Sequence, residues 1–280
     1  QLLRDSSALG LIEEALARCR SLDPAPRETE ARLLSILGHT HLSRHEYSKA
    51  IQAYEESLAL DVDTPDLRRL SYIYGSLMLA YEELGEFAKS ERYAKRSMAL
   101  FETLRDNVAM VTAENNLALL RYKQGELSTA LKHAETALRM SEELGIEAGK
   151  ANLLMTMAEL ELARSRHQSA TNYAVRALEL AQRTGETVNA GEAHTWLARI
   201  AAARRDDATA DSEFKVAFQM FESAGATEWL ARGHFVYAEI LEARGNLLAA
   251  NRSLRSAMTA LGMPSGTSSG LAHSLRVATA

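Results

Sequence analysis

The sequence predicts an all-α fold, a solenoid of antiparallel helix pairs. Two observations predict it, and both share a period of forty residues. Turn-forming residues recur with that period, and so does a small residue. The small-residue series consists of Ala50, Ser90, Ala130, Ala170, Ala210 and Ala250. A strict period of this length indicates a stack of similar units rather than one globular core.

Each forty-residue block, counted from Ala31, is expected to form two helices joined by a tight turn. Small residues at the eighth, twentieth and twenty-seventh places allow helix backbones to approach closely, and larger apolar residues fill the remaining space. The second helix is expected to stop at Gly145, Gly185 and Gly225, which are themselves forty residues apart. The turn is expected at the fifteenth place, which holds His45, Gly85, Gly125, Ser165, Arg205 and Gly245.

The chain divides into three predicted segments. Residues 1–30 form a half repeat and N-terminal cap, and residues 31–262 form six tandem helix-turn-helix repeats. Residues 263–280 form a linker followed by either a capping helix or a tail. Within the second segment, Thr64-Pro65-Asp66 predicts a helix start, with Thr64 as the N-cap. Because the chain opens at Gln1 inside a half repeat, we expect it to be a piece of a longer protein.

Two stretches carry a family resemblance. They are Asn116–Leu127, read as NLALLRYKQGEL and followed by Ala130, and Leu77–Phe87, read as LMLAYEELGEF. The pattern over residues 31–262 resembles the tetratricopeptide repeat, in the forty-residue form of bacterial regulator sensor domains and cell-polarity adaptors. The resemblance implies a right-handed superhelix whose first helices line a concave face. Met78 at a small-residue place, and the missing turn glycines of repeats four and five, predict local loosening.

By this resemblance, places two, five, six, nine, twelve and thirteen of each repeat point into the groove. Asn side chains there can hold a peptide backbone, and aromatic and Met side chains supply apolar contact area. Asn116 is the strongest single candidate. The predicted peptide- or protein-binding residues are Tyr72, Leu79, Asn115, Asn116, Leu119, Tyr122, Asn152, Met155, Thr156, Glu159, Trp196, Arg199 and Phe235.

Bulk properties argue against several classes of partner. The net charge of −5 disfavours broad contact with nucleic-acid phosphates. No apolar run has the length of a membrane span, and the chain does not open with a secretory signal. Cys19 is the only cysteine, so an internal disulfide is impossible, and this fits a cytoplasmic location.

The sequence contains no pattern typical of a catalytic or metal site. There is no phosphate loop, nucleophile elbow or dinucleotide glycine motif. His41 and His45 have the spacing of a zinc-binding pair, but the sequence offers no third ligand for them. We therefore expect no enzyme activity, no metal and no cofactor.

The leading functional hypothesis is a protein- or peptide-binding repeat module. In this hypothesis the chain is the ligand-sensing or partner-docking part of a larger regulatory protein, in signalling or transcription regulation. The alternative is a structural oligomerisation scaffold without a small ligand, which would make the chain a homo-oligomer. The identity of the partner, the domain upstream of Gln1 and the oligomeric state stay open.

Overall fold

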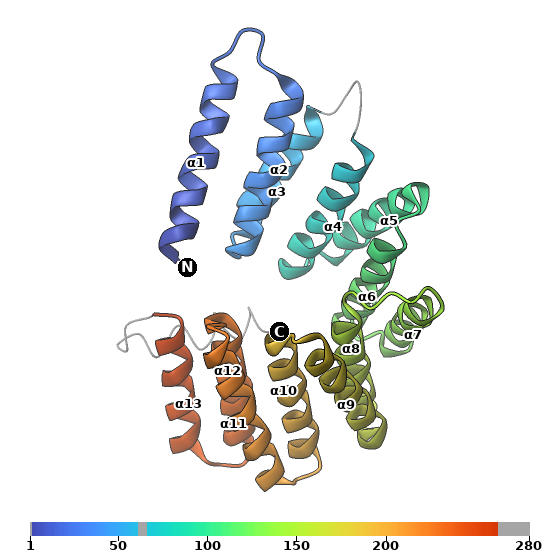
Figure 1. Cartoon of the computed structure of the whole chain (residues 1–280), viewed down its shortest axis with the longest axis vertical. Coiled ribbons are helices and arrows are strands. Elements are labelled where there is room, and N and C mark those ends of the chain that lie inside the picture. The colour runs from blue at the N-terminus through green and yellow to red at the C-terminus, as the bar shows by residue number, and fades with distance from the viewer. Residues whose placement is uncertain (1, 61–65, 263–280) are drawn as a thin grey trace. The chain divides into compact units, whose positions relative to one another are not determined.

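The computed structural model describes residues 2–60 and 66–262. These residues form thirteen α-helices and no strand, which confirms the all-α class (Figure 1). The chain separates into two compact units, Gln1–Gly125 and Glu126–Ala280, each described by itself below. Thr64, Pro65 and the predicted linker and tail at 263–280 lie outside the described residues, so the three-segment division stays a prediction.

Unit 1 contains six helices, which pack against one another in chain order. Helices α2 and α3 form one antiparallel pair, and α4 and α5 form the next. Successive pairs also touch, because α3 packs on α4 and α5 packs on α6. The helices are α1 (Leu2–Arg20), α2 (Arg27–Ser43), α3 (Tyr47–Ala59), α4 (Leu67–Glu83), α5 (Phe87–Leu104) and α6 (Asn107–Lys123).

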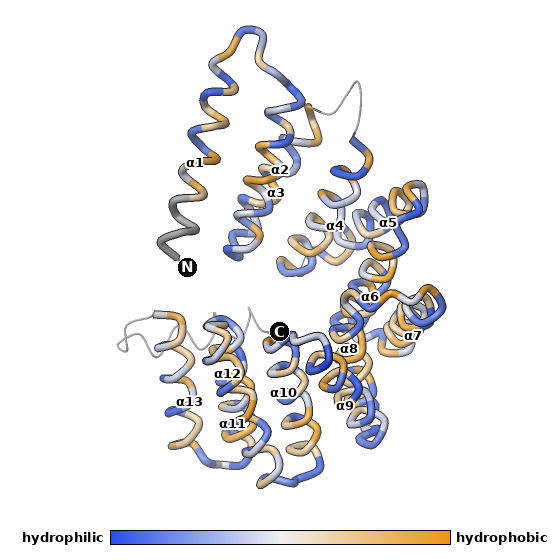
Figure 2. The backbone as a smooth tube through the Cα atoms, viewed as in Figure 1, coloured by the Kyte–Doolittle hydropathy of each residue, from blue (hydrophilic) through white to orange (hydrophobic). Residues whose placement is uncertain are grey.

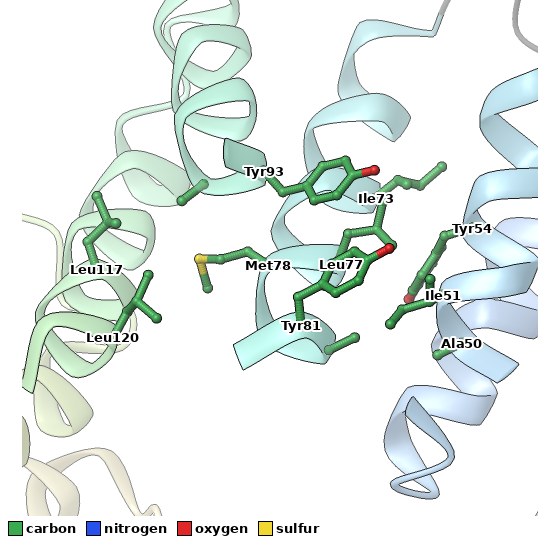
Figure 3. Packing of buried hydrophobic residues seen from close by; sticks show 12 residues of the cluster. Ala50, Ile51, Tyr54, Ile73, Leu77, Met78, Tyr81, Tyr93, Leu117 and Leu120 are labelled. Carbon is green, nitrogen blue, oxygen red and sulfur yellow. The ribbon is translucent and has the colours of Figure 1, made fainter. Parts of the chain in front are cut away.

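The core of unit 1 is a cluster of aromatic and aliphatic side chains from four helices (Figure 3). Tyr54 comes from α3, Tyr81 from α4 and Tyr93 from α5, while Leu120 belongs to α6. The rings of Tyr81 and Tyr93 are stacked, with centroids 5.6 Å apart and planes inclined by 3°. This cluster fills the space between successive helix pairs, so each repeat relies on its neighbour for its core.

Unit 2 contains the remaining seven helices. The pairs are α8 with α9, α10 with α11, and α12 with α13, and Figure 1 shows α10 to α13 side by side. The first helix α10 also contacts α8 and α12, so three first helices are neighbours. The helices are α7 (Leu127–Glu143), α8 (Lys150–Ala163), α9 (His167–Thr184), α10 (Thr187–Ala203), α11 (Asp207–Ser223), α12 (Thr227–Ala243) and α13 (Leu247–Ala260).

The forty-residue series of small residues lies at the helix contacts, as predicted. All six members of the twentieth-place series, from Ala50 to Ala250, are at most 2% exposed. The twenty-seventh place is equally buried, from Ser57 to Ala257. Helices such as α5, α7 and α9 are amphipathic, whereas α8 is buried over most of its length, and hydrophilic and hydrophobic residues are interspersed along the helices in Figure 2. Burial of the small places therefore sets the register of each pair.

The predicted turns are present in all six repeats, including those without glycine. Gly125 has a φ of 79°, and Ser165 and Arg205 adopt the same left-handed region with φ of 58° and 62°. The backbone N–H of Arg205 donates to the carbonyl of Ala202 at 2.9 Å, as that of Gly125 donates to Tyr122 at 2.8 Å. The prediction of loosened turns in repeats four and five is wrong, because the hydrogen bonds hold the same geometry without glycine.

Two further expectations need correction. Helix α4 begins at Leu67, and its N-cap is Asp66, whose carboxylate accepts a hydrogen bond from the backbone N–H of Arg69 at 3.1 Å. The cap is therefore the acid itself and not Thr64. Met78 causes no loosening, since it is 2% exposed and belongs to the core cluster of unit 1.

Candidate functional site

A cavity of about 210 Å³ opens between α10, α11 and α12 of unit 2. Its walls combine large aromatic rings with charged side chains of both signs. The aromatic lining is Trp196, Phe221 and Trp229, and the charged lining is Glu192, Arg199, Arg232 and Glu239. Thr195, Gly233 and Val236 complete the wall. We call this cavity the α10–α12 pocket.

The repeat register explains why these side chains meet. Glu192 and Arg232 hold the second place of repeats five and six, and Arg199 and Glu239 hold the ninth. Places two, six and nine are separated by four and three residues, so they lie on one face of a helix. Because α10 and α12 are neighbouring first helices, the same face of each repeat contributes to one pocket.

Two glycines allow the backbones of α10 and α12 to approach the aromatic rings of α11 closely. A Cβ atom built on Gly191 would lie 2.7 Å from Cε1 of Phe221, closer than any real contact. A Cβ on Gly233 would lie 3.1 Å from the ring of Phe218. Glycine at these two places therefore lets α10 and α12 settle against the rings of α11.

Each of the two tryptophan rings makes a cation–π contact with an arginine side chain. Cζ of Arg199 lies 3.9 Å from the ring centroid of Trp196, and Cζ of Arg232 lies 5.4 Å from that of Trp229. Trp229 also stacks on Phe221, with centroids 6.4 Å apart. These are the only two tryptophans of the chain, and both line the same pocket. Such cation–π contacts hold the aromatic walls in place.

Glu192 is the unusual charged group of the pocket. Burial raises the pKa of its carboxyl, Arg232 opposes that shift, and Glu159 on α8 adds to it. Within the described part of the chain, the Glu192 carboxylate makes neither a hydrogen bond nor an ion pair. A carboxylate that is largely removed from water without a partner is energetically costly.

Apart from Glu159, which is half-buried on α8, the predicted site residues of unit 2 fall into three groups. Trp196 and Arg199 line the α10–α12 pocket, and Asn152 is exposed on α8. Met155 and Thr156 are only 3% and 6% exposed and, unlike the equally buried Trp196, they do not line the pocket. Phe235 packs in the core between α12 and α13 and does not line the pocket.

The predicted residues of unit 1 lie on α4 and α6. Tyr72 is 53% exposed and makes an edge contact with Phe101. Leu79 is also exposed, and the α6 residues are half-buried. A role for these residues in binding stays a prediction, and those on α6 are Asn115, Asn116, Leu119 and Tyr122.

Several pocket residues were missed by the sequence prediction. Glu192 and Arg232 stand at the groove place two, so the repeat rule contains the signal that finds them. Trp229 stands two residues before the first place of repeat six, where the rule assigns no groove contact. Only its packing on Phe221 places it in the wall.

The histidines that resemble a zinc pair have other partners. His41 Nδ1 lies 2.7 Å from a carboxylate oxygen of Glu46, and His45 Nδ1 lies 2.9 Å from the hydroxyl of Tyr47. The described residues contain no group of three or more ligating side chains that could hold a metal ion. In the same part of the chain, no helix combines the length and apolar character that crossing a membrane requires.

Comparison with known proteins identifies the repeat. The family model for the tetratricopeptide repeat matches residues 69–143 and 108–183. A solved protein described by its tetratricopeptide repeat sensor, the STAND ATPase PH0952 from Pyrococcus horikoshii, has a TM-score of 0.60 to this chain. Residues 69–183 contain tetratricopeptide repeats. At 18% identity, the match covers 93% of this chain and 45% of that one.

Two other solved structures share the fold of this tetratricopeptide repeat protein. Aspartyl phosphate phosphatase F from Bacillus subtilis has a TM-score of 0.74 at 12% identity, over 92% of this chain and 66% of that one. A Rap protein complexed with competence and sporulation factor has a TM-score of 0.66 at 14% identity, over 89% of this chain and 72% of that one. Comparison with curated protein sequences gives no match.

Proposed function

We propose that this chain is a peptide- or protein-binding repeat module whose α10–α12 pocket anchors one side chain of the partner. The observation that carries the proposal is the meeting of both tryptophans in one small cavity. At about 210 Å³, the pocket is below the usual size of a drug-like ligand site, roughly 300–1,000 Å³, and suits a single side chain.

The chemistry of the lining supports an anchor role. Tryptophan and arginine are the residues most enriched among those that dominate binding energy at protein interfaces. Here two of each line one pocket, and the arginines already hold the rings in fixed positions. A preformed aromatic wall loses little conformational entropy when a ligand arrives, which favours affinity.

The second part of the proposal concerns regulation. We propose that the module senses a ligand or docks a partner for a larger signalling or transcription regulator. Two neighbours support this reading, since one carries a tetratricopeptide repeat sensor and another is complexed with competence and sporulation factor. We assign the chain no catalytic role, and we place it in the cytoplasm.

The α6 residues of unit 1 are proposed as a second binding surface. Asn116 is half-buried on the first helix of its repeat, as are its neighbours Asn115 and Leu119. An Asn side chain offers both a donor and an acceptor, so it can pair with a peptide backbone whatever the ligand sequence.

A pull-down from cell extract with three forms of the protein tests the proposal. The forms are the wild type, Trp196→Ala with Trp229→Ala, and Asn116→Ala with Tyr122→Ala, with folding checked by circular dichroism. A partner retained by the wild type and lost by the tryptophan variant supports the α10–α12 pocket. Loss with only the Asn116 and Tyr122 variant moves the site to α6. Equal capture by all three contradicts both sites.

An oligomerisation scaffold is the second candidate, and one observation favours it. Leu247 and Leu248 at the start of α13 are 63% and 72% exposed, an unusual pair of apolar side chains in water. Light scattering at increasing protein concentration tests self-association. A monomer at every concentration removes this candidate, and a dimer lost in Leu247→Ser with Leu248→Ser supports it.

A further inference from the structure

The structure points to the kind of side chain that the α10–α12 pocket accepts, and this inference rests on the proposed function. We propose that the pocket anchors a basic side chain, arginine or lysine, whose cationic group pairs with Glu192 beside the tryptophan walls.

The first argument is the missing partner of Glu192. Its carboxylate lines the pocket without a hydrogen bond or ion pair to any described residue. Arg232 is close enough to influence the carboxyl, but no ion pair joins them in the described structure. A guanidinium or ammonium entering the pocket supplies the donors that the carboxylate lacks, and charge-assisted hydrogen bonds of this kind are strong.

The second argument is the aromatic wall. The protein's own Arg199 lies 3.9 Å above Trp196, which demonstrates that a guanidinium fits against this wall. Tryptophan is the best aromatic partner for a cation, and the contact strengthens where water is excluded. Because Trp196 is 7% exposed and already covered by Arg199, the half-buried ring of Trp229 is the indole on which a ligand arginine can stack while its N–H groups reach the carboxylate of Glu192.

The third argument is the charge of the surface around the pocket. The lining holds two glutamates and two arginines, and both arginines are engaged with the tryptophan rings, whereas the carboxylate of Glu192 has no hydrogen bond or ion pair with a described residue. A ligand carboxylate would meet Glu192 with Glu159 close by, whereas a ligand cation would reduce their mutual repulsion. Arg232 opposes a cation, but it is exposed, makes no ion pair with a described residue, and directs its guanidinium at the ring of Trp229.

Three short peptides test the inference directly. The probes are acetyl-Ala-Ala-Arg-Ala-Ala-amide, the same peptide with citrulline, which is a neutral isostere of arginine, and the same peptide with glutamate. Tryptophan emission is the readout, because both indoles lie in the pocket. We expect the arginine peptide to bind on the order of tenfold more tightly than the citrulline peptide. No response to arginine, or equal binding of all three, overturns the inference.

Variants separate a basic anchor from an acidic one. Glu192→Gln should remove the preference for arginine over citrulline. Arg232→Gln should strengthen binding of the arginine peptide, because it removes a like charge, whereas weaker binding would overturn the inference. The control is Glu222→Gln, an exposed glutamate of α11 outside the pocket, which makes the same charge change and should leave binding unaltered.

The pH dependence gives an independent readout. Binding of a cation favours the ionised form of Glu192, so affinity should fall as the pH drops through the pKa of that carboxyl. The charges that act on it are Arg232 on α12 and Glu159 on α8, and Arg199 lies on its own helix. Glu192→Gln should make the profile flat, and a slope unchanged in that variant overturns the inference.

The two proposals can fail separately. In one outcome, the tryptophan double variant loses the partner, whereas Glu192→Gln keeps it and binds each of the three peptides as tightly as the wild type does. The binding module then stands and the basic anchor is contradicted. If the tryptophan variant retains the partner, the proposed function loses this pocket as its site.

Discussion

The ring of Phe221 occupies the space that a side chain at Gly191 would need. A Cβ atom there would lie 2.7 Å from Cε1 and 3.0 Å from Cδ1 of that ring. Phe221 in turn stacks on Trp229 in the wall of the α10–α12 pocket. The glycine on α10 thus controls both the packing of α11 and the shape of the pocket.

Gly191→Ala is therefore expected to lower the free energy of unfolding by about 1–3 kcal/mol, the usual cost of overpacking a close contact. Urea unfolding followed by circular dichroism measures the change. The matched control is Gly10→Ala on α1, where an added Cβ meets no described atom within 4 Å. That control should gain up to about 1 kcal/mol from helix propensity. Equal effects of the two changes would contradict this account of Gly191.

Arg205→Gly is expected to stabilise the protein. Arg205 has a φ of 62°, a left-handed conformation that costs a residue with a Cβ atom roughly 1 kcal/mol and costs glycine little. The expected gain is about 0.5–1 kcal/mol in the free energy of unfolding. The neighbouring Arg204→Gly serves as control, because Arg204 has a φ of −85° and gains nothing from glycine. Stabilisation by both changes would point to charge instead of backbone strain.

His234 is expected to make the protein less stable in acid. Burial lowers its pKa to about 4, and its ring stacks on Phe218 with centroids 3.9 Å apart. The unfolded chain, with a histidine pKa near 6.5, takes up a proton that the folded form refuses. The part of the stability that depends on neutral His234 is therefore fully present above about pH 6.5 and is lost as the pH falls towards 4.

The expected loss from this histidine is about 2 kcal/mol, after allowing for its partial contact with water. His234→Phe keeps an aromatic ring against Phe218 and should remove that part of the acid sensitivity. Urea unfolding at a series of pH values compares the two proteins. Identical pH profiles would contradict the assignment to His234.

Lys123 is expected to stabilise unit 1 by pairing with the buried carboxylate of Glu82. Its Nζ lies 3.1 Å from Oε1 of Glu82 and 2.9 Å from Oε1 of Glu83. Burial raises the pKa of Glu82, whose side chain is 5% exposed. Lys123→Met should destabilise the protein by about 3 kcal/mol, because it leaves that carboxyl buried without a counter-charge.

A double-mutant cycle with Glu82→Gln checks this pairing. The double variant should be less destabilised than the sum of the two single variants, because the neutral amide needs no cation. Additive losses in the free energy of unfolding would mean that Lys123 acts through other contacts.

The fold follows from the sequence because its strongest signals are steric. A place that must be small in every repeat, such as Ala130 or Ala210, is visible in a single sequence once the period is known. The turns follow for the same reason. The sequence misled where a residue other than glycine, such as Arg205, accepts the left-handed conformation, and also at the cap of α4 and at Met78.

The candidate site was less predictable, because it depends on how particular side chains pack. The groove rule selects Trp196 and Arg199, which line the pocket, but it also selects Met155, which is 3% exposed and does not. Trp229 lies outside the rule altogether and reaches the pocket through its stacking on Phe221. Periodicity reports which face of a helix is turned inward, whereas exposure depends on the sizes of the side chains opposite.

The buried seam of small residues also limits how such a chain can change in length. Because Ala170 and Ala210 are fully enclosed, removing a segment of any other length than the period would put a larger side chain into a space fitted for alanine. Deleting or duplicating a whole period leaves every helix facing an equivalent neighbour. Insertions and losses in this protein are thus expected to come in whole repeats, so that its surface grows or shrinks by one helix pair at a time.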